Sequence, residues 1–279
     1  MFGLFKPPEA LASPAAISAA VTSKLEAAPK VSHVVVSAED PSRLDVTFDG
    51  KERRFFLDNL IALVANEAHS PRSQHRHVRE YVTAFLEAAG EKEIDLSRVY
   101  PVVRHIDYIA PVGDAAIQGP VTGDLVCALM LDSPKTLSSL TQDMIEEADL
   151  AHAEIWGAAR YNLNAALKDV AEMKTPLGMR TLALERNWLG LSTLLTPDLF
   201  QVARRDLGAE MLFLVAINRN GVEFVDAAEP GAFELAQAAV LEGLKQDHPQ
   251  SACIYTLSDG DASPEPGWFF ENGEFYAVG

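Results

Sequence analysis

The densest cluster of chemically active side chains is Arg72–Arg79, which reads Arg-Ser-Gln-His-Arg-His-Val-Arg. Its His75 and His77 form an HxH pair. On a strand such a pair points both imidazoles to one face, where they can hold a metal ion. Here the pair follows Ser70-Pro71, which is typical of a helix start. On a helix, residues two positions apart diverge by about 200°, so joint ligation of a metal is disfavoured.

The same cluster has two further interpretations. A helix N-terminus beside cations such as Arg72 and Arg76 favours a phosphate or carboxylate, and His69 can contribute from upstream. The simpler interpretation is a solvated basic face. The sequence leaves both open, and an anion site would belong to an enzyme or a ligand-binding protein.

Two further arginines, Arg104 and Arg219, each close an apolar run that is typical of a strand. In an acidic protein, such a guanidinium either pairs internally with Asp or Glu or projects into a pocket for an anionic ligand. We favour the internal pair and keep the ligand as the alternative. The candidate binding residues are therefore Arg72, His75, Arg76, His77, Arg104 and Arg219.

The sequence holds no assembled catalytic motif. The acidic run Asp143–Glu154 spaces two carboxylates and His152 by three, but a di-metal bundle site needs Glu-x-x-His from two helices, so an acid-rich helix start explains the run better. His105 beside Asp107 is a loose acid–base pair, and a lone histidine there is usually structural. There is no G-x-S-x-G elbow, P-loop or G-x-G-x-x-G fingerprint. We assign no catalytic residue, no metal ligand and no cofactor.

The amino-acid composition favours one cellular compartment and disfavours two classes of binding partner. The 279 residues include 40 acidic and 23 basic side chains, so 23 − 40 gives a formal charge of −17, which disfavours nucleic acid and anionic lipid. Both cysteines, Cys127 and Cys253, lie in apolar runs without metal-ligand spacing, which favours buried free thiols and the reducing cytoplasm. No run approaches the ~18–20 apolar residues of a membrane span. We expect a cytoplasmic protein with no membrane span.

These residues must be positioned by an α+β fold. Hydrophobic periodicity predicts helices near residues 14–28, 150–167 and 231–246, with a buried strand at 125–131. Three Xaa-Gly turns, Asp49-Gly50, Asn220-Gly221 and Asn272-Gly273, predict hairpins. The expected fold has mixed, largely antiparallel sheets built from hairpins and packed against amphipathic helices, with two similar α/β halves as one arrangement.

Four motifs resemble the DUF1444 family of YtpQ-like bacterial proteins. In chain order they are Arg98-Val99-Tyr100-Pro101-Val102-Val103-Arg104, Trp156-Gly157-Ala158-Ala159-Arg160-Tyr161-Asn162-Leu163, Leu194-Leu195-Thr196-Pro197-Asp198-Leu199 and Leu214-Val215-Ala216-Ile217-Asn218-Arg219-Asn220. They are similar to the family's R-[IV]-Y-P-V-[IV]-R segment, its helix ending in A-x-x-N-L, its L-L-x-P-x-L helix start and its V-A-V-P-N-R-D strand and turn. Ile217 and Asn220 depart from the last of these.

The resemblance implies one unit over residues 1–279 in a cytoplasmic bacterial protein, and it implies no activity. The Gly- and Pro-rich loop at 110–123 is the candidate sub-boundary. We expect a non-catalytic module that binds a protein partner, because ample core and an acidic surface come without a catalytic constellation. The alternative is an anion- or metal-binding enzyme with a site near Arg72–Arg79, and nucleic-acid binding through that cluster ranks last.

Overall fold

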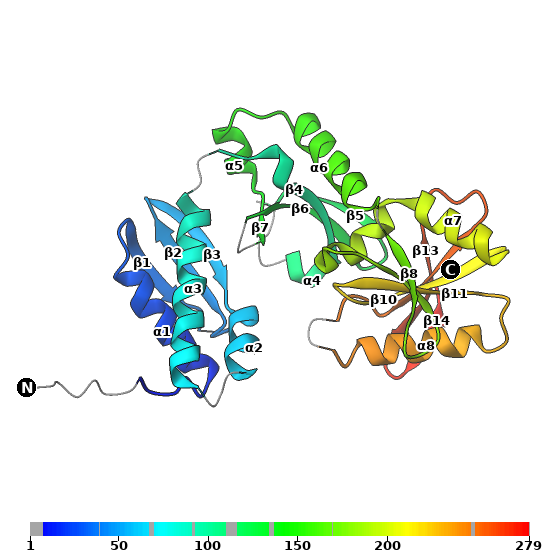
Figure 1. The fold of residues 1–279 in the computed structure, drawn as a ribbon, viewed down its shortest axis with the longest axis horizontal. Coiled ribbons are helices and arrows are strands. Elements are labelled where there is room, and N and C mark those ends of the chain that lie inside the picture. The colour runs from blue at the N-terminus through cyan, green and yellow to red at the C-terminus, as the bar shows by residue number, and fades with distance from the viewer. Residues whose placement is uncertain are drawn as a thin grey trace, which may run out of the picture. The chain divides into compact units, whose positions relative to one another are not determined.

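A computed structural model describes residues 8–38, 40–66, 70–90, 93–109, 116–133, 137–168, 170–246 and 249–278. The chain forms two compact units (Figure 1). Unit 1 comprises Met1–Glu93 with Ser133–Leu137, and unit 2 comprises Ile94–Asp132 with Ser138–Gly279. The loop at 110–123 lies inside unit 2, and its residues 110–115 lie outside the described residues.

Unit 1 is a three-stranded antiparallel sheet with helices over one face. Its elements are α1 (Pro14–Glu26), β1 (Val31–Val36), β2 (Arg43–Phe48), β3 (Lys51–Phe56), α2 (Asp58–Asn66) and α3 (Pro71–Gly90), with strand order β1-β2-β3. Alternation along β2 buries Leu44, Val46 and Phe48. These side chains face the apolar stripes of the helices, including Val21 of α1 and Val78 of α3.

Local sequence explains the turns and helix starts of unit 1. Asp49 and Gly50 have φ of 52° and 80°, the positive values that a type I′ hairpin turn requires. Ser70 begins α3 as expected. Its hydroxyl accepts a hydrogen bond from the Ser73 N–H at 3.4 Å, and Pro71 is the first helical residue.

The first part of unit 2 is a sheet of order β4-β6-β5, with β7 also paired to β6. Its elements are η1 (Leu96–Arg98), β4 (Val99–His105), α4 (Ile106–Ile109), β5 (Gln118–Thr122), β6 (Leu125–Asp132), β7 (Leu137–Ser139), α5 (Gln142–Glu147) and α6 (His152–Ala166). The nearly continuous apolar run of β6 is buried on both faces, as predicted. The core on one face includes Leu129 and Ile155 of α6.

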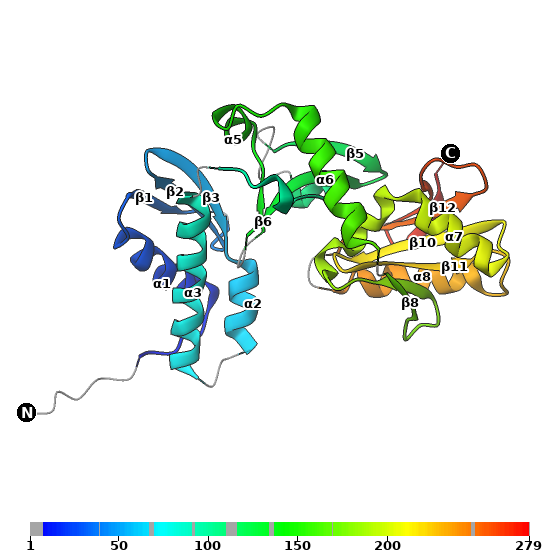
Figure 2. The same cartoon turned by 45° about the horizontal axis from the view of Figure 1, so that its top comes forward.

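The rest of unit 2 is a seven-stranded antiparallel sheet with order β14-β13-β12-β10-β11-β9-β8. Its elements are β8 (Ala171–Lys174), β9 (Arg180–Ala183), η3 (Asn187–Leu195), α7 (Pro197–Leu207), β10 (Met211–Asn218), β11 (Gly221–Asp226), α8 (Ala232–Gly243), β12 (Cys253–Ser258), β13 (Glu265–Glu271) and β14 (Glu274–Ala277). Alternate residues of β10 enter two cores. Leu212 and Leu214 meet η3 and α7, whereas Phe213 and Val215 meet α8, which lies across the opposite face (Figures 1 and 2).

The α+β class is confirmed, because the described strands form three largely antiparallel sheets packed against helices. Hairpins occur at all three predicted Xaa-Gly turns. Asn272 and Gly273 have positive φ, but Asn220 and Gly221 do not, so the middle hairpin turns differently. Within the described part of the chain, no helix is both long and apolar enough to cross a bilayer.

Candidate functional site

Arg104 lies near the end of β4, an edge strand whose free side is covered by η3. Only 3% of the residue is exposed. Its Nη1 donates to the Val103 carbonyl at 2.6 Å and its Nη2 donates to the Trp188 carbonyl of η3 at 3.1 Å. The Val103 N–H in turn donates to the Ser192 hydroxyl of η3 at 3.2 Å. Arg104 thus brackets η3 onto the edge of the sheet.

Among the described residues the Arg104 guanidinium contacts no carboxylate, so the expected internal ion pair is not found there. Its guanidinium bonds neutral carbonyl oxygens instead. Burial lowers the pKa of Arg104 to about 10; the nearby Tyr108 opposes that shift and Arg219 adds to it. The guanidinium lies 6.0 Å from the centroid of the Tyr108 ring. Arg104 therefore remains a buried cation at neutral pH.

Arg219 reaches the same region from the turn between β10 and β11. The Asn220 N–H donates to the Asn218 side-chain oxygen at 2.8 Å, which fixes the turn with Arg219 exposed at its tip. The turn abuts η3 at Gly190, where an added Cβ would lie 1.8 Å from the Asn220 carbonyl oxygen. The turn that carries Arg219 therefore lies against η3, the element that Arg104 also contacts. We call Arg104, Tyr108 and Arg219 the Arg104 site.

His105, the next residue of β4, belongs to a second polar cluster. Its Nε2 lies 3.6 Å from the Asp124 carboxylate, and the Asp107 N–H donates to its Nδ1 at 3.2 Å. The Nε2 edge of the imidazole therefore faces Asp124, while the Nδ1 edge faces Asp107.

Asp124, at the turn between β5 and β6, is the centre of this cluster. Its carboxylate accepts from the Ser251 hydroxyl at 2.7 Å, the Tyr255 hydroxyl at 2.7 Å and the Ala252 N–H at 3.2 Å. These donors lie at or just before β12 in the seven-stranded sheet. We call Asp124, His105, Ser251 and Tyr255 the Asp124 cluster, and it joins the two sheets of unit 2.

The Asp124 cluster contains Ser, His and Asp but is not arranged as a catalytic triad. The Ser251 hydroxyl donates to the carboxylate rather than to the imidazole, and it accepts from the Cys253 N–H at 3.0 Å. Ser251 is only 4% exposed. A triad requires the histidine between nucleophile and acid. The arrangement is that of a structural clamp, which sequence reasoning did not detect.

Both thiols of unit 2 are buried and unbonded to each other. Burial raises the pKa of Cys127 to about 12, and burial together with Asp124 raises the pKa of Cys253 to about 11. The thiolate is the nucleophilic form, so neither cysteine is activated near neutral pH. Burial and the Asp124 charge likewise raise the pKa of Tyr255 well above its ordinary value.

The side chains of Arg72–Arg79 have separate structural partners in unit 1. His75 Nε2 contacts the Glu9 carbonyl at 2.9 Å, while His77 lies 3.4 Å from the Ser73 hydroxyl and 3.7 Å from Glu80. The rings therefore diverge, as the helix predicts, and the described residues contain no group of three or more potential metal ligands.

The arginines of this cluster lie on the exposed side of α3. The Arg76 side chain donates to the Ser73 hydroxyl at 2.9 Å and lies 4.0 Å from the Glu80 carboxylate, and Arg72 is exposed. His69, which could have extended an anion site, lies outside the described residues. These contacts fit the solvated basic face better than a built site.

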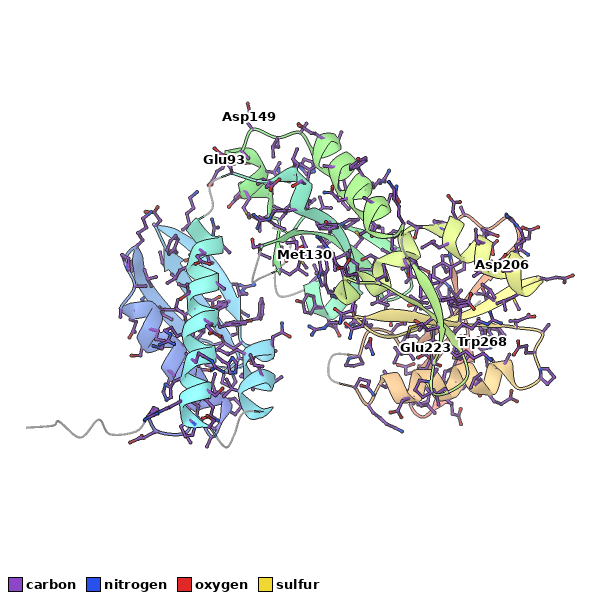
Figure 3. The ribbon with its side chains drawn as sticks, in the orientation of Figure 1. Glu93, Met130, Asp149, Asp206, Glu223 and Trp268 are labelled. Carbon is purple, nitrogen blue, oxygen red and sulfur yellow. The ribbon has the colours of Figure 1, made fainter. Side chains whose placement is uncertain are left out.

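The acidic run Asp143–Glu154 does not form one helix. Asp149 has a φ of 52° in the loop between α5 and α6 and points outward there (Figure 3). Gln142 donates to Glu146 at 2.8 Å and contacts His152 at 2.9 Å, so both of these side chains meet the same amide. The side chains spaced by three positions therefore do not lie on one face of a single helix.

Unit 1 offers a different kind of site at the open edge of β1. A groove of about 350 Å³ lies between α1 and the end of β1. It is lined by Ala15, Ser18, Ala19, Thr22, Ser23, Glu26, Val36 and Pro41. Val35 and Val36 are 43% and 37% exposed. We call this space the β1 groove. Sequence reasoning identified the β-branched strand but not its exposure.

Comparison with known proteins adds no assignment: no family model, no curated protein and no solved structure matches the chain. The function must be argued from the Arg104 site, the Asp124 cluster and the β1 groove alone.

Proposed function

We propose that the protein is a non-catalytic binding module that takes up an extended segment of a partner protein at β1. The supporting observation is that, among the described residues, no strand pairs with the outer edge of β1, which lies beside the β1 groove. Docking by strand addition supplies main-chain hydrogen bonds from the edge and side-chain pockets from the groove. Membership of the DUF1444 family and a cytoplasmic location remain parts of the same proposal.

The backbone of β1 is set to receive a further strand. The Ser37 N–H donates to the Arg43 carbonyl at 2.9 Å, and β1 pairs with β2 through Val35 and Asp45 as well as Val36 and Leu44. In an antiparallel ladder, hydrogen-bonded and non-hydrogen-bonded pairs alternate. The N–H and C=O groups of Val36 therefore point away from β2, toward the open edge. Natural proteins usually cover or charge such an edge.

The β1 groove continues the core of unit 1 toward this edge. Val36 pairs with Leu44, which is fully buried, so both side chains point to the helical face of the sheet. Where an added strand would lie beside β1, the groove is lined by small side chains of α1 such as Ala15 and Ala19. An added strand with apolar side chains at alternate positions would fill this space, which is why the proposed occupant is an extended apolar peptide.

The experiment is a selection of random linear peptides against the full chain, followed by affinity measurement on two variants. Val36→Pro removes an N–H that points outward, and proline is tolerated on an edge strand. Val35→Thr keeps every backbone group and changes a side chain on the opposite face. We expect enriched peptides with alternating apolar residues that lose at least tenfold in affinity to Val36→Pro and little to Val35→Thr.

Hydrogen exchange on the peptide-bound protein gives a second readout. A bound strand should slow exchange at the outward N–H groups of β1, including that of Val36. Peptides that bind Val36→Pro as tightly as the parent protein, or that protect only amides elsewhere, would contradict docking at this edge.

A further inference from the structure

We propose that the strand taken up at β1 is β1 of a second copy of this chain, so that two copies of unit 1 share one continuous sheet across a two-fold axis. This inference rests on the proposed function, because it uses the same edge of β1 and names the occupant. A two-fold axis perpendicular to the sheet reverses the direction of the second strand, so the two edges pair antiparallel and the helices of both copies cover the same face.

The two outer strands of the unit 1 sheet differ in charge. β3 reads Lys-Glu-Arg-Arg-Phe-Phe, and charged side chains of this kind keep an edge strand from pairing with another chain. β1 reads Val-Ser-His-Val-Val-Val and contains no Asp, Glu, Lys or Arg. Its Val35 and Val36 side chains are exposed. The sequence therefore protects the sheet against pairing at β3 and leaves β1 able to pair.

The backbone of β1 selects one register for this pair. Val35 and Ser37 face β2, so the N–H and C=O groups of Val34 and Val36 point outward. A bulge near the start of β1 and the end of the strand at Val36 leave these two residues as the regular part of the outer edge. With the axis at Val35, Val34 of each copy pairs with Val36 of the other, and the outward groups of both residues are satisfied.

The side chains on both faces of the sheet suit this register. On the helical face, Val34 and Val36 of the second copy would enter the β1 groove, where the small side chains of Ala15 and Ala19 leave room. On the outer face, Val35 would meet Val35 of the second copy in a non-hydrogen-bonded pair, with the Cα atoms about 4.5 Å apart. The contact therefore buries apolar side chains that are exposed in a single copy.

The charges at the two ends of β1 are complementary in the same register. Lys30 precedes the strand and Asp40 follows it, five positions from Val35 on either side. The Lys30 side chain also pairs with Asp49 and is 55% exposed. An antiparallel copy brings the Lys30 end of each strand beside the Asp40 end of the other, so the contact opposes unlike charges at both ends.

The net charge of unit 1 also fits an identical partner. Unit 2 carries 27 acidic and 11 basic side chains, so 11 − 27 gives −16 of the total formal charge of −17. A nearly neutral surface does not repel its own copy, whereas a strongly acidic surface does. Self-association is therefore favoured at the unit that carries β1.

The experiment measures self-association of the full chain by analytical ultracentrifugation. Val35→Lys and Val35→Glu each place two like charges across the axis, whereas an equal mixture of the two variants places opposite charges there. We expect a dimer for the parent chain, a dissociation constant at least tenfold weaker for each variant alone, and recovery of the dimer in the mixture. Thr47→Lys is the matched control, because it adds the same charge to the outer face of β2 and should leave the dimer unchanged.

Hydrogen exchange and peptide binding separate this inference from the proposed function. Protection of the Val34 and Val36 amides should rise with protein concentration. The Val35→Lys variant should bind the selected peptides at least as tightly as the parent chain, because its edge is no longer covered by a second copy.

Three results would overturn the second copy as the occupant. They are a chain that stays monomeric yet binds peptides at β1, a dimer that both Val35 variants leave intact, and protection of the β1 amides that does not depend on concentration. The first of these leaves the proposed function standing. A chain that neither self-associates nor binds a peptide at β1 would refute both.

Discussion

Replacing Tyr255 by phenylalanine tests whether the Asp124 cluster holds the two sheets of unit 2 together. The substitution removes one oxygen and keeps the ring, which is completely buried against the core. That oxygen donates to Asp124 at 2.7 Å and lies 2.6 Å from the Ser251 hydroxyl oxygen. The perturbation is therefore confined to these contacts.

The expected loss follows from the kind of hydrogen bond removed. A hydrogen bond to a charged acceptor contributes about 1.5–3 kcal/mol. The Asp124 carboxylate keeps its bonds from Ser251 and the Ala252 N–H, and its side chain is 14% exposed, so water can replace part of the loss. We expect Tyr255→Phe to lower the free energy of unfolding by about 2 kcal/mol.

Urea denaturation followed by tryptophan fluorescence measures this loss selectively. All three tryptophans, Trp156, Trp188 and Trp268, belong to unit 2. The signal therefore reports the unit that contains the Asp124 cluster, and far-ultraviolet circular dichroism follows the whole chain.

A double-mutant cycle with Asp124→Asn separates the bond from the packing. Because Tyr255 and Asp124 are in direct contact, their losses should not add, and we expect a coupling of about 1–2 kcal/mol. Strict additivity, or a loss below about 0.5 kcal/mol for Tyr255→Phe, would refute the clamp.

Two further predictions concern titrating groups of unit 2. Burial raises the pKa of Glu223 on β11 (labelled in Figure 3), which the nearby Thr175 hydroxyl partly offsets; its contribution to stability is therefore present below about pH 4.5 and lost as the pH rises through the folded-state pKa. Glu223→Gln should raise the free energy of unfolding, measured in urea at pH 7, by less than about 1 kcal/mol, with no gain near pH 4, and a loss at pH 7 would contradict this. The raised pKa values of Cys127 and Cys253, about 12 and 11, predict stability that is lost from about pH 9 upward. A thiol reagent at pH 8 should label neither cysteine in the folded protein and both in urea, and rapid labelling of the folded protein would show that the thiols are accessible.

Short-range sequence signals predicted the local structure well. The Asp49-Gly50 pair specifies its turn because both residues tolerate positive φ, and Ser70-Pro71 specifies a helix start because its hydroxyl and its ring fit the first turn. The Asn220-Gly221 pair gave a hairpin but not the expected turn, because the Asn218 side chain binds the Asn220 N–H and reshapes the loop.

The polar cluster of unit 2 could not be predicted from spacing. Asp124 meets Ser251 and Tyr255 across 127 and 131 positions. In the sequence Asp124 follows Gly123 at the end of a short polar stretch, which is typical of a turn and indicates no long-range partner. The sequence indicated the local pair of His105 and Asp107. Asp124, the centre of the cluster, also lies beside His105, and only the strand pairings of β5, β6 and β12 bring the members of the cluster together.

The division of charge between the two units bears on the docking proposed at β1. Unit 1 has 12 basic and 13 acidic side chains, so 12 − 13 gives a formal charge of −1, whereas unit 2 carries −16. A partner segment therefore meets no strong long-range field at β1, and docking there depends on main-chain hydrogen bonds and apolar contact in the β1 groove. Because added salt screens interactions between charges, docking at the near-neutral surface of unit 1 should depend little on ionic strength.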